Sequence, residues 1–250
     1  MRRVEARRYL ASLLSEGLAP FNYVQRHTRF DANDAVEFVA PLFLGYEKTV
    51  CVIFHGPPKG TGLDGLIVDL QVTSPRQAEV RTMLGLQPNG GQGSQSTGVE
   101  VAPVLGVGML ALIGMWGSEK QKEERRPLGW ANPSGRPIDE VGHEIVGLVR
   151  DLGERFFSCV DTPLALGESL LELESFPGVS PNRGAPGSES RWEFAATIFH
   201  DLGLPDRSRE AFRRGIEQVR DRVATGLMHE DSLEHLEALE AKYGPWLNRH

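Results

Sequence analysis

Apolar residues alternate with polar ones, or run together, in three short segments of the N-terminal half of the chain. These segments are rich in valine, isoleucine and phenylalanine, and they cover residues 36–44, 49–54 and 66–72. Short runs of this composition are typical of β-strands. Because the segments lie close together in the sequence, we expect them to pair as antiparallel neighbours.

Elsewhere the apolar residues recur every three or four positions, which is the spacing of one face of an α-helix. This pattern predicts a helix near the N-terminus, a second over about 138–158 and a third that opens at Thr162. A short helix is also predicted from Ser74, its N-cap, to Gly85, its end. Three more helices are predicted between residue 191 and the C-terminus.

The order of these elements predicts an α+β fold. A mainly antiparallel sheet is flanked by helices and followed by a helical C-terminal section. Residues 176–190 are rich in proline, glycine and serine, a composition typical of a linker. We therefore expect an α+β domain over residues 1–175, a linker over 176–190 and a helical section over 191–250.

Residues 101–116 form an uncharged segment that is consistent with two interpretations. A transmembrane helix needs about 20 apolar residues, whereas this run is shorter and contains Pro103 and three glycines. We expect strands or a buried hairpin here. A membrane-associated protein that uses this segment is kept as an alternative.

Composition narrows the classes of function. The chain has 250 residues and a formal net charge of -7, which argues against a general nucleic-acid-binding protein. Its two cysteines, Cys51 and Cys159, are too few and too far apart for a disulfide framework or a cysteine zinc site. Both lie in apolar stretches, so we expect two buried free thiols in a cytoplasmic protein without a signal peptide.

Gly60, Gly62 and Gly65 follow an apolar run with the spacing GxGxxG of a dinucleotide-binding turn. In such a turn the glycines lead into a helix whose N-terminus receives the pyrophosphate. Here they lead into residues 66–72, which alternate like a strand. We therefore interpret residues 55–65 as a long hairpin connection and predict no cofactor.

No histidine spacing indicates a metal site. His143 begins an HExxH pattern, but Gly147 stands where the second ligand belongs, and His229 and His235 are six residues apart. The GxSxG turn of serine hydrolases is absent from the sequence. Paired acids such as Glu230 and Asp231 are interpreted as solvated charges. The sequence thus predicts no metal ligand and no catalytic residue.

Five residues are candidates for binding. Trp116 and Trp130 flank a charged tract, and tryptophans are either core anchors or parts of partner-binding surfaces. His55, Asp64 and Asp69 surround the hairpin connection. They would form the first site to test if the protein is an enzyme whose site is assembled there.

The order of elements resembles a group of small bacterial α+β domains, some of which are encoded beside toxin genes as immunity-like proteins. The segments that carry the resemblance are LAPF at 18–21, GWANPSG, EVGHEIVGLVRDLGERFF and TPLALGESLLE, within residues 5–175. The resemblance implies a cytoplasmic binding protein and supplies no catalytic residue.

The C-terminal section resembles a tetratricopeptide-type helical hairpin. The matching positions are Ala196, Leu202, Gly203, Ala211 and Phe212. A solenoid needs about three stacked repeats, so we expect a single helical hairpin.

These observations favour a non-catalytic, cytoplasmic protein-binding module, immunity-like in kind, that acts on a protein partner through its shape and its acidic surface. The alternatives are an enzyme with a site around residues 55–65 and a membrane-associated protein that uses residues 101–116.

Overall fold

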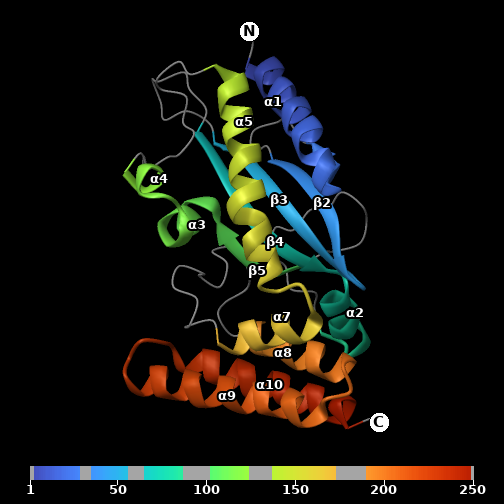
Figure 1. Cartoon of the computed structure of the whole chain (residues 1–250). Helices are drawn as coiled ribbons and strands as arrows, with labels where there is room; N and C mark the ends of the chain where they lie inside the picture. Colours follow the sequence, from blue (N-terminus) through green and yellow to red (C-terminus); the bar gives the residue numbers. More distant parts are fainter. Residues whose placement is uncertain are drawn as a thin grey trace. The chain divides into compact units, whose positions relative to one another are not determined.

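The protein has an α+β fold, with a five-stranded sheet and a helical C-terminal section (Figure 1). The computed structural model describes residues 3–28, 35–55, 65–86, 102–123, 137–172 and 190–248. These residues group into two compact units. The first unit contains residues 3–28, 35–55, 65–73, 106–123 and 137–159, and the second contains residues 74–86, 102–105, 160–172 and 190–248.

The strands follow the chain across the sheet in the order β1-β2-β3-β4-β5. They are β1 (Val24–Thr28), β2 (Ala35–Phe43), β3 (Tyr46–His55), β4 (Gly65–Ser74) and β5 (Ala102–Gly108). Strands β1 to β4 pair as antiparallel neighbours. The three predicted strands are confirmed, whereas β1 was missed because its sequence VQRHT has no apolar alternation.

One face of the sheet is apolar and buried. The register places Phe38, Val50 and Leu70 side by side, and each is 0% exposed. Helices α1 (Arg3–Leu18) and α5 (Ile138–Leu148) lie side by side over the sheet in Figure 1. Because side chains alternate along a strand, the apolar face requires the β-periodicity that the sequence shows.

The predicted long helix is confirmed, with one irregularity. Helix α5 continues through a π-helical turn, Val149–Gly153, into α6 (Glu154–Ser158). Small residues let α1 approach it, since a Cβ atom on Gly17 would lie 2.6 Å from a methyl carbon of Val146. The close contact between these helices therefore depends on a glycine.

The second unit is helical, apart from residues 102–105 at the beginning of β5. It contains α2 (Arg76–Met83), α7 (Pro163–Leu171), α8 (Ser190–Asp201), α9 (Pro205–Ala224) and α10 (Glu230–Leu247). The Thr162 hydroxyl caps α7 by accepting a hydrogen bond from the backbone N–H of Ala165 at 3.1 Å. Gly203 and Gly226 have positive φ angles where α8 and α9 end. The predicted C-terminal helices are confirmed.

A short helix also follows β4, as predicted. The Ser74 hydroxyl accepts a hydrogen bond from the backbone N–H of Arg76 at 3.1 Å, although α2 begins at Arg76 rather than beside Ser74. Gly85 follows the helix with φ +67°. Helix α2 groups with the C-terminal helices, as does α7. Of the expected linker at 176–190, only Ser190 lies within the described residues, where it begins α8.

The expectation of strands or a hairpin over residues 101–116 is half wrong. Strand β5 is present, but Met109–Trp116 forms helix α3, which is followed by α4 (Glu119–Glu123). A short apolar run does not distinguish a strand from a buried helix, and methionine, leucine and alanine are good helix formers. Within the described ranges, no helix is long and apolar enough to cross a membrane.

The expectation of two buried thiols is also half wrong. Cys51 is buried in β3, whereas Cys159 is exposed at the end of α6. The Cys159 thiol donates to the backbone carbonyl of Arg155 at 3.3 Å. The apolar neighbours Phe156 and Phe157 face the core instead, because successive helical residues point in different directions.

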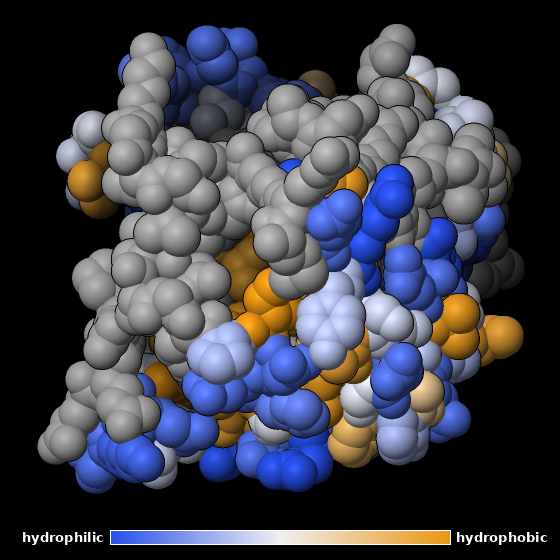
Figure 2. Space-filling model, turned by 90° about the horizontal axis from the view of Figure 1, so that it is seen from above, coloured by the Kyte–Doolittle hydropathy of each residue, from blue (hydrophilic) through white to orange (hydrophobic). Residues whose placement is uncertain are grey.

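Several large apolar side chains remain exposed. Leu44 at the turn between β2 and β3 is 98% exposed, Leu227 is 75% exposed and Val24 is 66% exposed. Figure 2 shows apolar residues that reach the surface between hydrophilic ones. Single exposed apolar residues of this kind are common in soluble proteins, so exposure alone does not define a site.

We expect Gly215→Ala to destabilise the helical unit. A Cβ atom on Gly215 in α9 would lie 2.5 Å from two ring carbons of Trp192, which is buried. Overpacking of this kind costs about 1–3 kcal/mol. Gly244→Ala is the matched control, because nothing lies within 4 Å of its Cβ position and it should stabilise α10 by about 0.5–1 kcal/mol. Urea unfolding of both variants checks the prediction, and equal effects would contradict it.

A buried polar network joins three helices of the second unit. The carboxylate of Glu193 in α8, 0% exposed, accepts two hydrogen bonds from Arg81 Nη1 in α2, at 2.8 and 2.7 Å. The Tyr243 hydroxyl in α10 donates to the same carboxylate and accepts from Gln77 Nε2 at 3.0 Å. Burial, followed by the negative charge of Glu193, raises the pKa of Tyr243. The network keeps charged groups hydrogen-bonded inside the core.

We expect Glu193→Gln to be strongly destabilising, because it leaves the Arg81 guanidinium buried without a counter-charge. The loss should be about 3–5 kcal/mol, measured by thermal or urea unfolding. Asp201→Asn is the control, since Asp201 pairs with Arg76 at a site where the side chains are 31% and 38% exposed. That control should cost less than about 1 kcal/mol. Similar losses of unfolding free energy in the two variants would show that burial does not determine the cost of breaking these ion pairs.

Candidate functional site

The structure places the predicted binding residues on separate elements. Asp69 lies in the middle of β4, and its Oδ1 atom is 3.5 Å from the Cβ position of Gly108, where α3 begins. Trp116 is the last residue of α3, roughly 12 Å further along that helix at 1.5 Å per residue. Asp69 and Trp116 therefore do not form one site. Trp130 and Asp64 lie outside the described residues.

His55 is the last residue of β3 and pairs in register with Gly65, the first residue of β4. Strand β4 follows Gly65 directly, so the interpretation of residues 55–65 as a hairpin connection rather than a dinucleotide-binding turn is confirmed. Because Gly65 begins a strand, no helix follows it directly whose N-terminus could receive a pyrophosphate.

Asp69 belongs to a polar row across the sheet. The register places Glu37 opposite Cys51 and Cys51 opposite Asp69, so these side chains share one face. Burial raises the pKa of the Cys51 thiol, and the negative charges of Glu37 and Asp69 raise it further. The thiol therefore stays protonated, which makes it a poor nucleophile and a poor metal ligand.

The carboxylates of the polar row do not belong to a metal site. Across the described parts of the chain, no group of three or more histidine, cysteine, aspartate or glutamate residues could hold a metal ion. The polar row supplies two carboxylates beside a protonated thiol, which is an unsuitable set for a transition metal.

Trp116 is half-buried and lies against a cation. The guanidinium carbon of Arg155, in α6, is 4.6 Å from the centre of the Trp116 ring. This distance is typical of a cation–π contact. The sequence indicated the tryptophan but not its partner, because only folding brings α3 and α6 together.

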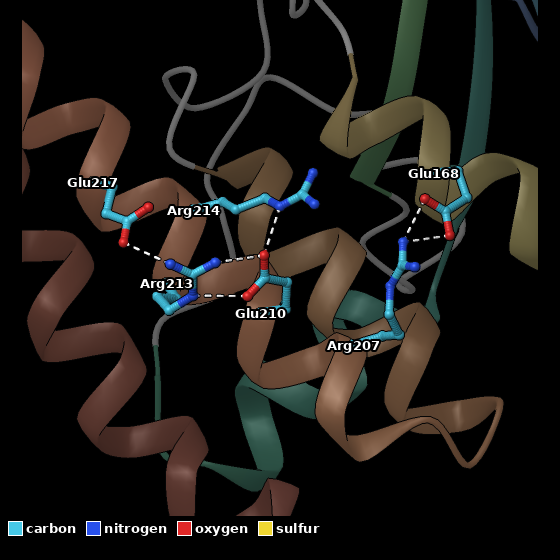
Figure 3. A network of polar contacts seen from close by, with 6 residues as sticks. All are labelled: Glu168, Arg207, Glu210, Arg213, Arg214 and Glu217. Atoms are coloured by element: carbon cyan, nitrogen blue, oxygen red, sulfur yellow. Dashed lines mark hydrogen bonds and ion pairs between the residues drawn. The ribbon is translucent and has the colours of Figure 1, made fainter.

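The charges on α9 are largely paired within the protein (Figure 3). The Glu210 carboxylate accepts hydrogen bonds from Arg213 at 2.7 Å and from Arg214 at 2.8 Å, and Arg213 also donates to Glu217 at 2.7 Å. Arg207 pairs with Glu168 of α7. Hydrogen bonds from Arg213 and Arg214 lower the pKa of Glu210 to about 2. Five of the six arginines of α9 thus have an ion pair among the described residues, with partners on α7, α9 and α10.

Helix α10 differs from α9 in its charge. Its sequence EDSLEHLEALEAKYGPWL contains five acidic residues and one lysine. Glu230, Glu234 and Glu237 are all exposed and are spaced by four and three residues, which places them on one side of the helix. We call these three residues the acidic stripe. Asp231 is also exposed, close to the beginning of the stripe.

The acidic stripe is only partly compensated. Glu237 pairs with Arg220 of α9 at 3.3 Å, at a site where both side chains are about half exposed. Within the described ranges, Glu230 and Glu234 have no ion pair. The helix dipole stabilises Glu230 in the first turn, but it does not reach the later residues. Like charges at this spacing repel each other by about 0.2–0.5 kcal/mol per pair.

The sequence contains a signal for this stripe. The spacing of the three glutamates by four and three residues is that of one side of a helix, although solvated charge is the ordinary interpretation of such acids. What the sequence could not show is that Glu210, Glu217 and Glu168 pair with three of the six arginines of α9, which are Arg207, Arg213 and Arg214. That pairing leaves α10 with an uncompensated negative charge.

Comparison with protein-family models, with curated proteins and with solved structures gave no match to this chain. The resemblances to immunity-like domains and to a tetratricopeptide-type hairpin therefore stay predictions. For the second of these, Ala196, Ala211 and Phe212 are buried between α8 and α9, while Leu202 is 39% exposed.

We expect Arg213→Gln to raise the pKa of Glu210 from about 2 toward the ordinary value of 4.5. Because folding lowers this pKa, the carboxylate contributes stability above about pH 4.5, and that contribution is lost as the pH falls toward 2. An NMR titration of the glutamate side-chain carboxyls measures the shift. Lys242→Gln in α10 is the control and should leave Glu210 unchanged. An unchanged Glu210 in Arg213→Gln would contradict the assigned cause.

Proposed function

We propose that this protein is a non-catalytic protein-binding module whose partner presents a basic surface to the acidic stripe of α10. The observation that carries the proposal is the contrast between neighbouring helices. Five of the six arginines of α9 have an ion pair among the described residues, whereas α10 exposes glutamates that repel one another. A helix does not need such a stripe in order to fold, since neutral residues would avoid the repulsion.

A basic partner would relieve this repulsion. Lysine or arginine side chains placed along the stripe would pair with Glu230 and Glu234, whose carboxylates have no ion pair among the described residues. Complementary charges of this kind speed up association and help to exclude other partners, and they are weakened by salt. The net charge of -7 also attracts a basic partner, over longer distances than the stripe does.

We further propose that this protein is immunity-like and cytoplasmic. Such a protein binds and neutralises another protein and needs no catalytic residue of its own. Two features support this class: Cys51 and Cys159 are both free, as in reducing compartments, and the described residues offer no metal cluster. The low reactivity expected of the Cys51 thiol is also more typical of a structural residue than of a nucleophile.

The test compares two triple variants of the tagged protein in affinity capture from its native cells, with mass spectrometry at low and moderate salt. The stripe variant carries Glu230→Gln, Glu234→Gln and Glu237→Gln. The control variant carries Glu79→Gln, Glu119→Gln and Glu172→Gln, which remove the same charge from exposed positions elsewhere. We expect the stripe variant to lose at least about tenfold of the stoichiometric partner at low salt, while the control retains it.

The wild-type complex should weaken as salt is raised, because exposed charge pairs are screened. Equal retention by the two triple variants would overturn the assignment to α10. Capture of no stoichiometric partner by the wild type would overturn the binding function itself.

A further inference from the structure

Helix α2 is attached to the other helices of the second unit mainly by polar contacts. Of its eight residues, only Gln77, Val80 and Arg81 are buried, and Val80 is the only apolar residue among these three. Met83, the last residue of the helix, is 57% exposed. The hydrophobic stabilisation of the docked α2 therefore comes mainly from one side chain.

The helices against which α2 docks have an apolar core of their own. Helix α8 buries large apolar side chains along its length, at Trp192, Phe194, Ile198 and Phe199. The ring of Tyr243 in α10 packs against Phe212 of α9, with ring centres 5.3 Å apart, and against Trp246, with ring centres 5.7 Å apart. None of these side chains belongs to α2, so the contacts among α8, α9 and α10 do not require it.

The polar contacts of α2 hold it in place only weakly. While α2 is docked, Arg81 and Glu193 each need the other, because a single buried charge is costly. When α2 moves away, water reaches both charges, and the regained hydration offsets much of the lost attraction. The pair between Arg76 and Asp201 is partly exposed and contributes little. The hydrogen bond from Gln77 to α10 is exchanged for hydrogen bonds to water.

We propose that α2 is a latch, which detaches from α8 and α10 in the native protein while α8, α9 and α10 stay folded. In the closed latch, the Glu193 carboxylate is buried and bound to Arg81 and Tyr243. Opening withdraws Arg81 from this carboxylate. Segments with few buried apolar contacts are the ones that open at the lowest free energy. The latch goes beyond the function proposed above and does not depend on it, because the acidic stripe is exposed whether α2 is docked or not.

Native-state hydrogen exchange of the full chain, read by NMR, tests the latch. A detached helix of eight residues is unstable in water, so its amides exchange whenever the latch opens. We expect the α2 amides to exchange at least about tenfold faster than the buried amides of α8 and α9. Low urea should leave exchange in α2 nearly unchanged and speed it in α8 and α9, because the urea dependence scales with the surface exposed. Equal rates and equal urea dependence in the three helices would overturn the proposal.

The variant Gly215→Ala distinguishes detachment of α2 from unfolding of the whole unit. The added Cβ atom crowds the ring of Trp192 between α8 and α9 whether α2 is docked or not. The substitution should therefore speed exchange in α8 and α9 and leave exchange in α2 unchanged. Equal acceleration in all three helices would show that α2 is released only by unfolding of the unit, and the latch would be wrong.

A pair of substitutions within α2 tests what keeps the latch closed. Val80→Ala removes methyl groups from the buried apolar side chain of α2 and should speed exchange of the α2 amides at least about tenfold. Met83→Ala is the matched control, since Met83 is mostly exposed, and it should leave these rates nearly unchanged. Circular dichroism confirms that both variants fold. Equal rates in the two variants would contradict the attachment of α2 through Val80.

Discussion

The helical unit depends on the buried ion pair between Arg81 and Glu193. Removing two charges from water is costly, and the pair is tolerable only because Tyr243 also hydrogen-bonds to the Glu193 carboxylate and the two Arg81–Glu193 hydrogen bonds are short. The network draws on α2, α8 and α10. It explains why α2, which follows a strand of the sheet in sequence, packs with helices from the other end of the chain. Once these charges are buried, any arrangement that separates α2 from α8 leaves a charge unpaired, and one that removes α10 takes away the hydrogen bond from Tyr243.

In the first unit, the core is formed by one apolar face of the sheet, and the other face carries polar side chains. Apolar rows such as Phe38, Val50 and Leu70 form the core, and the guanidinium of Arg7 in α1 lies 5.1 Å from the centre of the Phe54 ring on the same face. The other face carries the row of Glu37, Cys51 and Asp69, whose two acids help to keep the thiol protonated. This arrangement favours a structural role for the row. Helix α3 begins beside Asp69 and ends at Trp116.

The proposed function rests on Glu230 and Glu234, which have no ion pair among the described residues. In the helical unit, α9 has ion pairs for five of its six arginines, and the negative charge remains on the exposed side of α10. In the first unit, the guanidinium carbon of Arg155 lies 4.6 Å from the centre of the Trp116 ring. An exposed charge without an ion pair is available to a partner, and complementary charges help to select that partner.

The sequence by itself determined the α+β class, three strands and most of the helices, because alternation and three-to-four spacing are local properties of the chain. It missed β1, whose polar sequence is held in the sheet by pairing with β2, and it predicted strands or a hairpin where the apolar run over Met109–Trp116 forms a helix. It indicated Trp116 and contained the spacing of the acidic stripe. Only the tertiary structure decided which charges are paired, since the partners of Arg155, Glu193 and Glu210 depend on distances that folding creates.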